Sequence, residues 1–317
     1  MAEAVIVAAR RTPIGRAFKG SLIDARPDDL AAFVIRTLLE ELPALDPSEV
    51  DDVVVGAAVG AGEQGYNLGR AVALLAGLPD SVPGTTVSRM CASSLQAIRI
   101  AHHAIALGEA QVIVAAGVES VSRTAVASFK SDDANPRFVD KLREDFVSQY
   151  YLPMGMTAEN VADRYGVSRE EMDAFAMVSQ ERAVAAQAAG VFDREIAPYR
   201  LPGGRVVSRD DCPRPGTTLE GLAQLKPAFR PDGRVTAGNS CPLNDGAAAV
   251  VVMSDTCAKH LGIEPLARIV GSSVAGVSPE LMGVGPIPAV RKLLATTGMA
   301  IEDIGVIELN EAFAAQV

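Results

Sequence analysis

The chain has 317 residues, of which 49% are hydrophobic and 21% charged, and it carries a formal net charge of -10. This composition is too apolar for a disordered protein, and no apolar run approaches the roughly 20 residues that cross a bilayer. The acidic charge and the scarcity of aromatic residues, 4% with no tryptophan, disfavour nucleic-acid binding. We therefore expect a soluble globular protein without a membrane span and without a nucleic-acid partner.

The four cysteines and three histidines do not form a pattern typical of a metal site. There is no Cys-x-x-Cys pair, so neither zinc ligation nor a disulfide framework is predicted. At the N-terminus, apolar residues precede Arg10 and Arg11, which is the reverse order of a secretory signal. We expect reduced cysteines, no metal, and a cytoplasmic protein.

Strand-like and helix-like segments alternate along the chain, which predicts a layered α/β fold. The expected strands are residues 5–8, 53–55, 85–87, 112–116 and 247–253, and the expected helices are residues 28–42, 66–75, 92–107 and 169–189. Residues 120–234 are polar and rich in proline, which indicates an insertion into the α/β core. Within that insertion, Ser168 and Glu171 form a capping-box pattern before the last helix.

An internal repeat is visible in the order of the elements. The first strand, helix, acidic connector and strand return late in the chain as a strand at 267–270, a helix at 288–297, an acidic connector at 302–303 and a strand at 306–309. The first copy continues through two further strand-helix units. We therefore expect a duplicated fold whose second copy is incomplete in these 317 residues.

Cys91 is the first candidate for chemistry, because it lies between an expected strand and the start of an expected helix. A thiol at that place faces the unpaired amides and the positive end of the helix dipole, which favour the nucleophilic thiolate. The alternative is a small residue packed at a strand end, which is common for free cysteines. From position alone the two interpretations have about equal weight.

Several motifs extend this observation along the whole chain. They are Met90-Cys91-Ala92-Ser93-Ser94, Gly117-Val118-Glu119-Ser120, Gly155-Met156-Thr157-Ala158-Glu159-Asn160, Leu225-Lys226-Pro227-Ala228-Phe229, Thr236-Ala237-Gly238-Asn239, Asn244-Asp245-Gly246-Ala247 and Asn310-Glu311-Ala312-Phe313. In this order the motifs resemble those of the thiolase family of acetyl-CoA acyltransferases. The resemblance implies a duplicated five-layered α/β/α/β/α core. Residues 1–118, completed by about 238–264, would be the N-terminal half, residues 119–237 an inserted CoA-binding loop domain, and residues 265–317 the start of the C-terminal half.

The resemblance also implies a reaction, the thiolytic cleavage of a 3-ketoacyl-CoA or the reverse Claisen condensation. Cys91 matches the nucleophile that carries the acyl group, and its amide would contribute to one oxyanion hole. Asn310 matches an asparagine that orients a water at the other oxyanion hole. Asn310 can also be read as the N-cap of a helix over residues 311–316, and both roles are compatible.

CoA is expected as a substrate and no cofactor is expected. By position in the family pattern, Arg214 matches a residue against the adenine end of CoA and Phe229 one that lines the pantetheine tunnel, while Ala237, Cys241 and Phe313 are further substrate-binding candidates. Arg214, Lys226, Arg230 and Arg234 form a basic cluster, whose alternative is a solvated loop face.

The resemblance further implies that Met154 and Met282 line the acyl pocket, where flexible thioethers suit varied chain lengths. Ordinary core packing is their alternative. Pro153 stands where acetoacetyl-CoA-specific members usually have histidine, which favours broad-chain degradative 3-ketoacyl-CoA thiolases and hence fatty-acid beta-oxidation.

The family's histidine motif and its glycine-rich motif with a second catalytic cysteine are not found in these 317 residues. Cys241 does not match that second cysteine, and His102 is expected to pack on a helix, so we assign no base to Cys91. A catalytically incomplete, CoA-binding thiolase-like chain is therefore the alternative to an active enzyme. In both cases we expect a homodimer or homotetramer.

Overall fold

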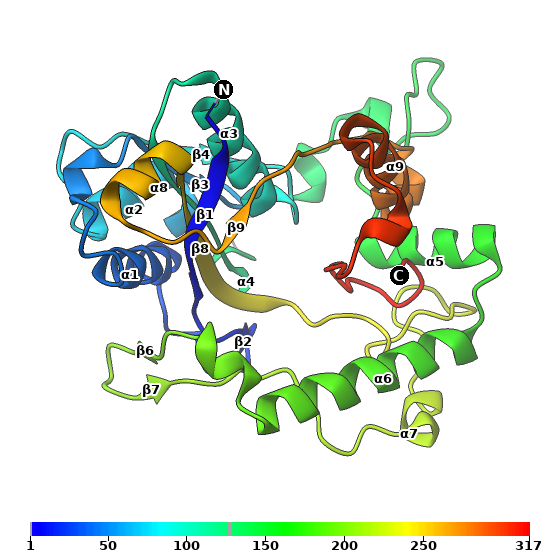
Figure 1. The fold of residues 1–317 in the computed structure, drawn as a ribbon. Coiled ribbons are helices and arrows are strands. Elements are labelled where there is room, and N and C mark those ends of the chain that lie inside the picture. The colour runs from blue at the N-terminus through cyan, green and yellow to red at the C-terminus, as the bar shows by residue number, and fades with distance from the viewer. Residues whose placement is uncertain (1, 126–128) are drawn as a thin grey trace. The chain divides into compact units, whose positions relative to one another are not determined.

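The computed structural model describes residues 2–125 and 129–317 (Figure 1). By their contacts these residues form two compact units. Unit 1 comprises Met1–Ser128, Ala189–Cys212 and Leu243–Ile269, and unit 2 comprises Phe129–Ala188, Pro213–Pro242 and Val270–Val317. Residues 189–212, expected within the insertion, thus pack with unit 1, and most of the expected second copy packs with unit 2. The predicted domain boundaries stay a prediction, since a grouping by contacts does not test a duplicated fold.

Unit 1 is built on one mixed sheet in the order β4-β3-β5-β8-β1-β9, with β2 also paired to β8. Strands β3, β4 and β5 are parallel, whereas β8 runs antiparallel to β5 and to β1. A separate hairpin pairs β6 with β7. The strands of unit 1 are β1 (Ala4–Arg11), β2 (Gly15–Arg16), β3 (Asp52–Gly56), β4 (Gly84–Val87), β5 (Val112–Ser120), β6 (Tyr199–Arg200), β7 (Val206–Val207), β8 (Asn244–Ser254) and β9 (Ala267–Arg268). Its helices are α1 (Pro27–Glu40), α2 (Leu68–Leu75), α3 (Ser93–Leu107), α4 (Val121–Thr124) and α8 (Asp255–Leu261).

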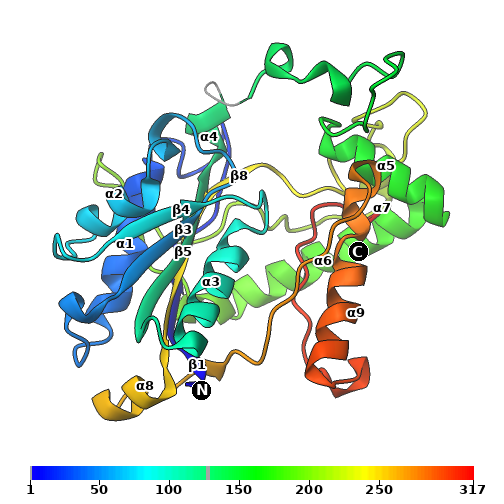
Figure 2. The same cartoon turned by 90° about the horizontal axis from the view of Figure 1, so that it is seen from above.

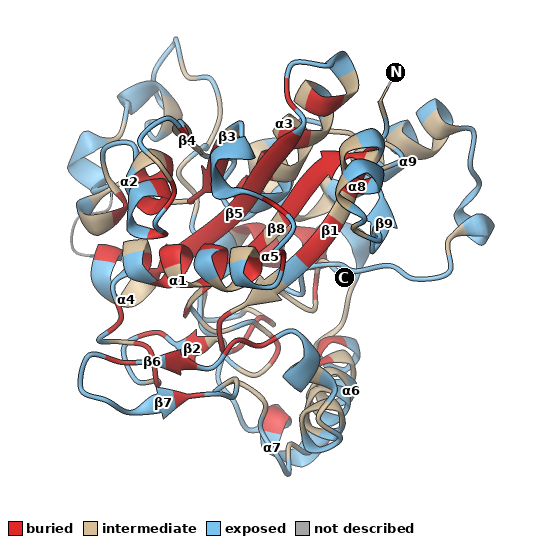
Figure 3. Ribbon diagram, turned by 60° about the vertical axis from the view of Figure 1, so that its left-hand side comes forward, coloured by how far each residue is buried: buried red, intermediate tan, exposed pale blue. Residues whose placement is uncertain are grey.

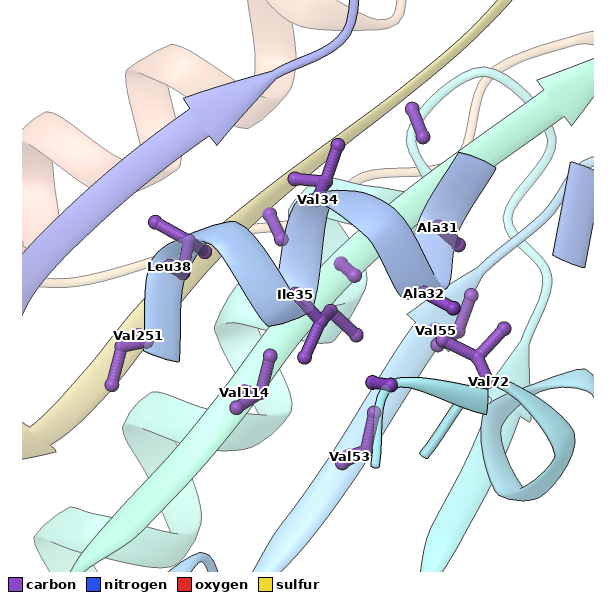
Figure 4. Close-up of a cluster of buried hydrophobic side chains, with 14 of the residues drawn as sticks. Ala31, Ala32, Val34, Ile35, Leu38, Val53, Val55, Val72, Val114 and Val251 are labelled. Carbon is purple, nitrogen blue, oxygen red and sulfur yellow. The ribbon is translucent and has the colours of Figure 1, made fainter. Parts of the chain in front are cut away.

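Helix α1 begins at Pro27, with Asp28 and Asp29 in its first turn, where the ring geometry and the negative charge both favour a helix start. One stripe of its apolar residues, which includes Val34, Ile35 and Leu38, is fully buried. Figure 4 shows these side chains over β3, β5 and β8, against valines such as Val114 and Val251. Each such buried side chain stabilises the fold by about 2 kcal/mol, so this layer supplies much of the core.

Helix α3 covers the other face of the same sheet, opposite α1 and α2 (Figure 2). Its buried residues Ala97, Ala101 and Ile105 recur every four positions, and the two alanines let the helix lie close to the strands. The helix ends at Gly108, whose left-handed φ of 78° allows its amide to reach back to the last turn. Because both faces are covered, the central strands are almost entirely buried (Figure 3).

Unit 2 consists of helices and connecting loops. Its helices are α5 (Met154–Tyr165), α6 (Arg169–Ala188), α7 (Leu219–Ala223) and α9 (Pro286–Thr297), with the 3-10 helix η7 (Pro279–Val284). A small core of Ala158, Ala162, Met172, Val235 and Ala315 joins α5, α6 and two loops. Helix α6 starts as predicted, because Glu171 accepts the amide and hydroxyl of Ser168.

The predicted alternation of strands and helices is confirmed in unit 1, within about two residues at most ends. Two predictions for the last segment are wrong. Residues 306–309 form no strand in the structure, and in place of the helix over residues 311–316 there is a β-bridge at Phe313 and a turn over residues 314–316. The physical reason is that Val306 and Ile307 are mostly exposed, so burial does not favour a strand there. Over the described ranges, no helix is long and apolar enough to cross a membrane.

Candidate active site

Cys91 lies in a tight turn between the end of β4 and the start of α3, as the sequence predicts, and it is exposed. The hydroxyl of Ser93 closes this turn, because its Oγ accepts the amide of Arg89 at 2.9 Å and donates to the carbonyl of Met90 at 2.6 Å. Met90, directly before the cysteine, has a left-handed φ of 48°. Such a conformation costs about 1 to 2 kcal/mol for a residue with a side chain and persists only where surrounding contacts impose it.

Two glycines bring the start of α3 close to the sheet. A Cβ at Gly56, at the end of β3, would lie 2.3 Å from the backbone carbon of Ser93. A Cβ at Gly117 on β5 would lie 2.4 Å from the Cβ of Ser94. Only glycine permits these approaches, so the carboxyl ends of β3 and β5 set the position of the helix end that follows Cys91.

Polar contacts hold the loop beside this turn. The carboxylate of Glu119 accepts the amide of Ala58 at 2.7 Å and the side-chain amide of Gln64 at 2.7 Å. Ser88 in turn donates its hydroxyl to the carbonyl of Ala58 at 3.3 Å. The turn that carries Cys91 is thus connected to β5 through side chains as well as through the sheet.

The other eight predicted site residues all belong to unit 2. Phe229 and Phe313 meet edge to face, with ring centroids 6.0 Å apart. The ring of Phe229 lies against Gly155, where a Cβ would be 2.2 Å from the ring carbon Cγ. Met154, directly before Gly155 in the sequence, is 43% exposed. The structure thus places Phe229, Phe313 and the start of α5 together, with apolar groups still open to solvent.

The segment with Asn310 is paired with the segment that ends at Cys241. Cys241 donates its amide to the carbonyl of Ala312 at 3.0 Å, and Ser240 forms a β-bridge with Phe313. Asn310 itself is exposed, and its neighbour Glu311 accepts a hydrogen bond of 2.5 Å from Ser179 on α6. Asn310 is therefore presented on an anchored loop rather than at the start of a helix.

Met282 and Ala237 also lie in unit 2 and are exposed. Met282 is part of η7, which packs on α5 through a hydrogen bond from Asn160 to the carbonyl of Glu280. Ala237 lies between the buried residues Thr236 and Asn239, so its backbone is held although its methyl group is open to solvent.

The predicted basic cluster divides into two kinds of cation. Arg230 and Arg234 both form ion pairs with Asp163, whose pKa is lowered by the hydrogen bond from Arg230 and then by the two guanidinium charges. Arg230 also lies 3.6 Å from the fully buried Glu159. Arg214 is exposed, and its backbone amide donates to Gln180 at 2.7 Å. Arg230 and Arg234 are thus partly neutralised within the protein, which disfavours them as phosphate ligands.

His102 lies on α3 and is half-buried, in agreement with the packed position expected for it. Its pKa is lowered by burial and, to a smaller extent, by the charge of His103. Both effects favour the neutral form of the ring over the charged one.

Met90, Glu159 and Asn239 lie within the motifs of the sequence, but the motifs alone assign none of them a role in this site. Glu159 is fully buried and accepts the amides of Arg234 and Val235 with its carboxylate at 2.9 Å. Besides its place in the motif, a charged residue amid the apolar positions of a helix is the sequence signal for Glu159. For Met90 the structural role depends on backbone geometry, and for Asn239 it depends on side-chain partners that are distant in the sequence.

Comparisons with known families match both parts of the chain. The family described as "Thiolase, N-terminal domain" matches residues 4–256, and the family described as "Thiolase, C-terminal domain" matches residues 263–317. The "Beta-ketoadipyl-CoA thiolase" of Pseudomonas aeruginosa is 49% identical, over 99% of this chain and 81% of that protein. An "Acetyl-CoA acetyltransferase" of the same organism is 46% identical, over 100% of this chain and 82% of that protein.

Solved structures agree with these matches. The acetyl-CoA acetyltransferase of Bacillus anthracis superposes with a TM-score of 0.89 at 42% identity, over 100% of this chain and 82% of that one. The dimeric peroxisomal thiolase of Saccharomyces cerevisiae gives a TM-score of 0.90 at 36% identity, over 99% of this chain and 80% of that one. The chain therefore shares its α/β architecture with both solved proteins, and the sequence identities of 42% and 36% support a relationship beyond the fold.

Proposed function

The chain belongs to the thiolase family and is an acyltransferase, and on that basis we propose that it cleaves 3-ketoacyl-CoA substrates by thiolysis through an acyl-thioester on Cys91. The observation that carries this proposal is the exposed thiol at the end of a strained, hydrogen-bonded turn before a 15-residue helix. An exposed thiol is within reach of a substrate, and its thiolate is the form that attacks a carbonyl carbon.

The proposed reaction has two acyl transfers. The Cys91 thiolate attacks the C3 carbonyl carbon, and the C2–C3 bond breaks with its electron pair leaving on C2. That carbon takes a proton from water and departs as acetyl-CoA, which leaves a shortened acyl group on sulfur, and the thiol proton lost by the second CoA later returns to water. The thiolate of a second CoA then attacks this thioester, and Cys91 leaves as a thiolate. Each transfer passes through an oxyanion that backbone amides or an oriented water stabilise, and we propose Asn310 for the latter role.

For the substrate we propose a 3-keto thioester whose acyl chain ends in a free carboxylate. The support is that several relatives, at 44% to 49% identity, are named beta-ketoadipyl-CoA thiolase. This replaces the fatty-acid chains that Pro153 alone suggests. The competing substrate is acetoacetyl-CoA, since other relatives are named acetyl-CoA acetyltransferase.

Turnover by the purified protein tests the proposed function. Thiolysis of 3-ketoadipyl-CoA, acetoacetyl-CoA and 3-ketodecanoyl-CoA is followed by the loss of the absorbance of the Mg²⁺-bound 3-keto thioester. We expect the largest kcat/KM with 3-ketoadipyl-CoA and a loss of about 10³-fold or more in Cys91→Ser. Cys257→Ser, which alters a half-buried cysteine on α8, is the matched control and should retain turnover. CoA binding without any turnover would instead favour the catalytically incomplete alternative.

Arg214 is the cation that we propose for the phosphorylated end of CoA, because it is exposed, whereas Arg230 is held by Asp163. Arg214→Ala should weaken CoA binding about 5- to 10-fold in low salt and leave the binding of a pantetheine thioester without phosphates unchanged. Calorimetric titration with both ligands measures this difference. Equal losses for both ligands, or none for CoA, would refute the assignment.

Self-association is also proposed for this chain. The solved relative from Saccharomyces cerevisiae is described as dimeric, and this chain aligns with it over 99% of its length. Light scattering coupled to size-exclusion chromatography tests the proposal, with a mass of two or four chains expected and a mass of one chain as the contradictory result.

A further inference from the structure

Asn239 is almost fully buried, with 2% of its surface exposed, and its side chain forms hydrogen bonds at both ends. Its Oδ1 accepts the amide of Thr236 at 2.8 Å, which closes the turn that contains Ala237. Its Nδ2 donates to Asp173 Oδ1 at 2.9 Å and to the carbonyl of Arg234 at 3.2 Å. The side chain therefore both shapes the turn and fastens it to α6.

Asp173 is itself a buried, paired carboxylate, 4% exposed. Its Oδ2 accepts the guanidinium Nε of Arg169 at 2.7 Å. Arg169 also donates to the carbonyl of Leu222 at 2.6 Å and to that of Leu225 at 3.0 Å. A buried carboxylate is tolerated only where such partners satisfy it, so the anchor to which Asn239 binds is itself fixed on several sides.

The backbone of Asn239 connects this anchor to a second site segment. Its carbonyl oxygen accepts the amide of Ala314 at 2.9 Å. Two residues further along the chain, Cys241 donates its amide to the carbonyl of Ala312. The segment that carries Asn310 and Phe313 is thus held against the segment that carries Ala237 and Cys241. Asn239 is the residue at which the side-chain anchor and this backbone pairing coincide.

We propose that Asn239, held by Asp173, is a positioning residue that fixes the two predicted CoA-binding segments, residues 234–241 and 310–316, relative to each other. It acts through Ala237, Cys241 and Phe313 and does not itself touch CoA. The inference rests on the proposed function, because those three residues are assigned to CoA binding there. If the inference is correct, replacing Asn239 lowers the affinity for CoA and leaves the alkylation of Cys91 unchanged.

The test uses a reciprocal exchange of the two side chains. Asn239→Asp sets two carboxylates against each other where an amide now donates, and should weaken the Kd for CoA about 10-fold or more. In the double variant Asp173→Asn with Asn239→Asp, the new amide at 173 can donate to the new carboxylate at 239 and still accept from Arg169. We expect the double variant to recover part of the lost CoA affinity, because the pair and its total charge are restored while the carboxylate at 239 cannot donate to the carbonyl of Arg234.

Two controls separate positioning from general destabilisation. Ser254→Ala removes a buried hydroxyl of unit 1 that accepts the amide of Cys257 and donates to Gln111. It should lower the melting temperature without changing the Kd for CoA or the alkylation of Cys91 by iodoacetamide. If Asn239→Asp does not fold, Asn239→Ala takes its place, with a weaker Kd than that of Ser254→Ala as the expected result.

The outcomes distinguish this inference from the proposed function. An unchanged Kd in Asn239→Asp, or a double variant that binds CoA no better than Asn239→Asp, would overturn the positioning role even if the wild type turns over. A wild type that binds CoA and shows the predicted exchange, yet never acylates Cys91, would support the positioning role and refute the catalytic proposal. A wild type that binds no CoA would refute both.

Discussion

Substituting alanine for Gly56 tests how the position of Cys91 depends on the packing beneath α3. The new Cβ would lie 2.3 Å from the backbone carbon of Ser93 and 2.5 Å from the backbone nitrogen of Ser94. Both are backbone atoms, so a rotamer change cannot relieve the contact. To reach 3.4 Å, where ordinary contact begins, the first turn of α3 and β3 must separate by about 1.1 Å.

Two quantities should change in Gly56→Ala. Overpacking of this kind costs about 2 to 3 kcal/mol of unfolding free energy, which urea or guanidinium titration measures. A displacement of about 1 Å at a reacting group can slow the reaction by about 100-fold, which quenched-flow mass spectrometry of Cys91 acylation measures. Both changes have the same cause, the movement of the turn that carries the thiol.

Gly60→Ala is the matched control, because Gly60 lies in the loop after β3 and a Cβ there would have no atom within 4 Å. It should leave stability within about 0.5 kcal/mol of the wild type and leave acylation unchanged. If Gly56→Ala behaves like Gly60→Ala in both assays, the account of how the sheet positions Cys91 is wrong.

Two further predictions concern stability. Ser254→Ala should lower the unfolding free energy by about 1 to 2 kcal/mol in a denaturant titration, because Ser254 caps α8 through the amide of Cys257, and a cost below about 0.3 kcal/mol would contradict this. For Asp163, the folded pKa lies below the unfolded value, so its pairing with Arg230 stabilises the fold at pH above that unfolded value and is lost as the pH falls through the folded one. Thermal melts between pH 2.5 and 6 should therefore show a shallower acid decline for Asp163→Asn than for the wild type, whereas a parallel decline would argue against the pairing.

The sequence predicts the parts of the fold that depend on local patterns. Helix α1 is predictable because Pro27 and the apolar stripe through Leu38 lie within one short segment, and the start of α6 because Ser168 and Glu171 are three residues apart. The place of Cys91 between β4 and α3 follows from the same kind of pattern. These features need only short-range geometry, which residue periodicity reflects directly.

Features that depend on distant partners are not predictable in this way. Asp173 and Asn239 are 66 residues apart, and neither residue type indicates the other. The grouping of Arg230 with Arg214 stays a prediction, but the pairing of Arg230 with Asp163, 67 residues away along the chain, has no signal in the sequence. A strand over residues 306–309 has the correct apolar pattern, yet strand formation also requires a neighbouring strand to accept its hydrogen bonds.

The most direct test of the central claim is the mass of the peptide that contains Cys91 after the protein is mixed with a 3-ketoacyl-CoA in the absence of free CoA and quenched in acid. We expect this peptide to gain the mass of the shortened acyl group and to lose it when CoA is added, whereas the peptides of Cys212, Cys241 and Cys257 should not change. An acyl group on another residue would contradict the role of Cys91 as the acyl carrier. So would turnover in which Cys91 stays unmodified, or turnover that persists in Cys91→Ser.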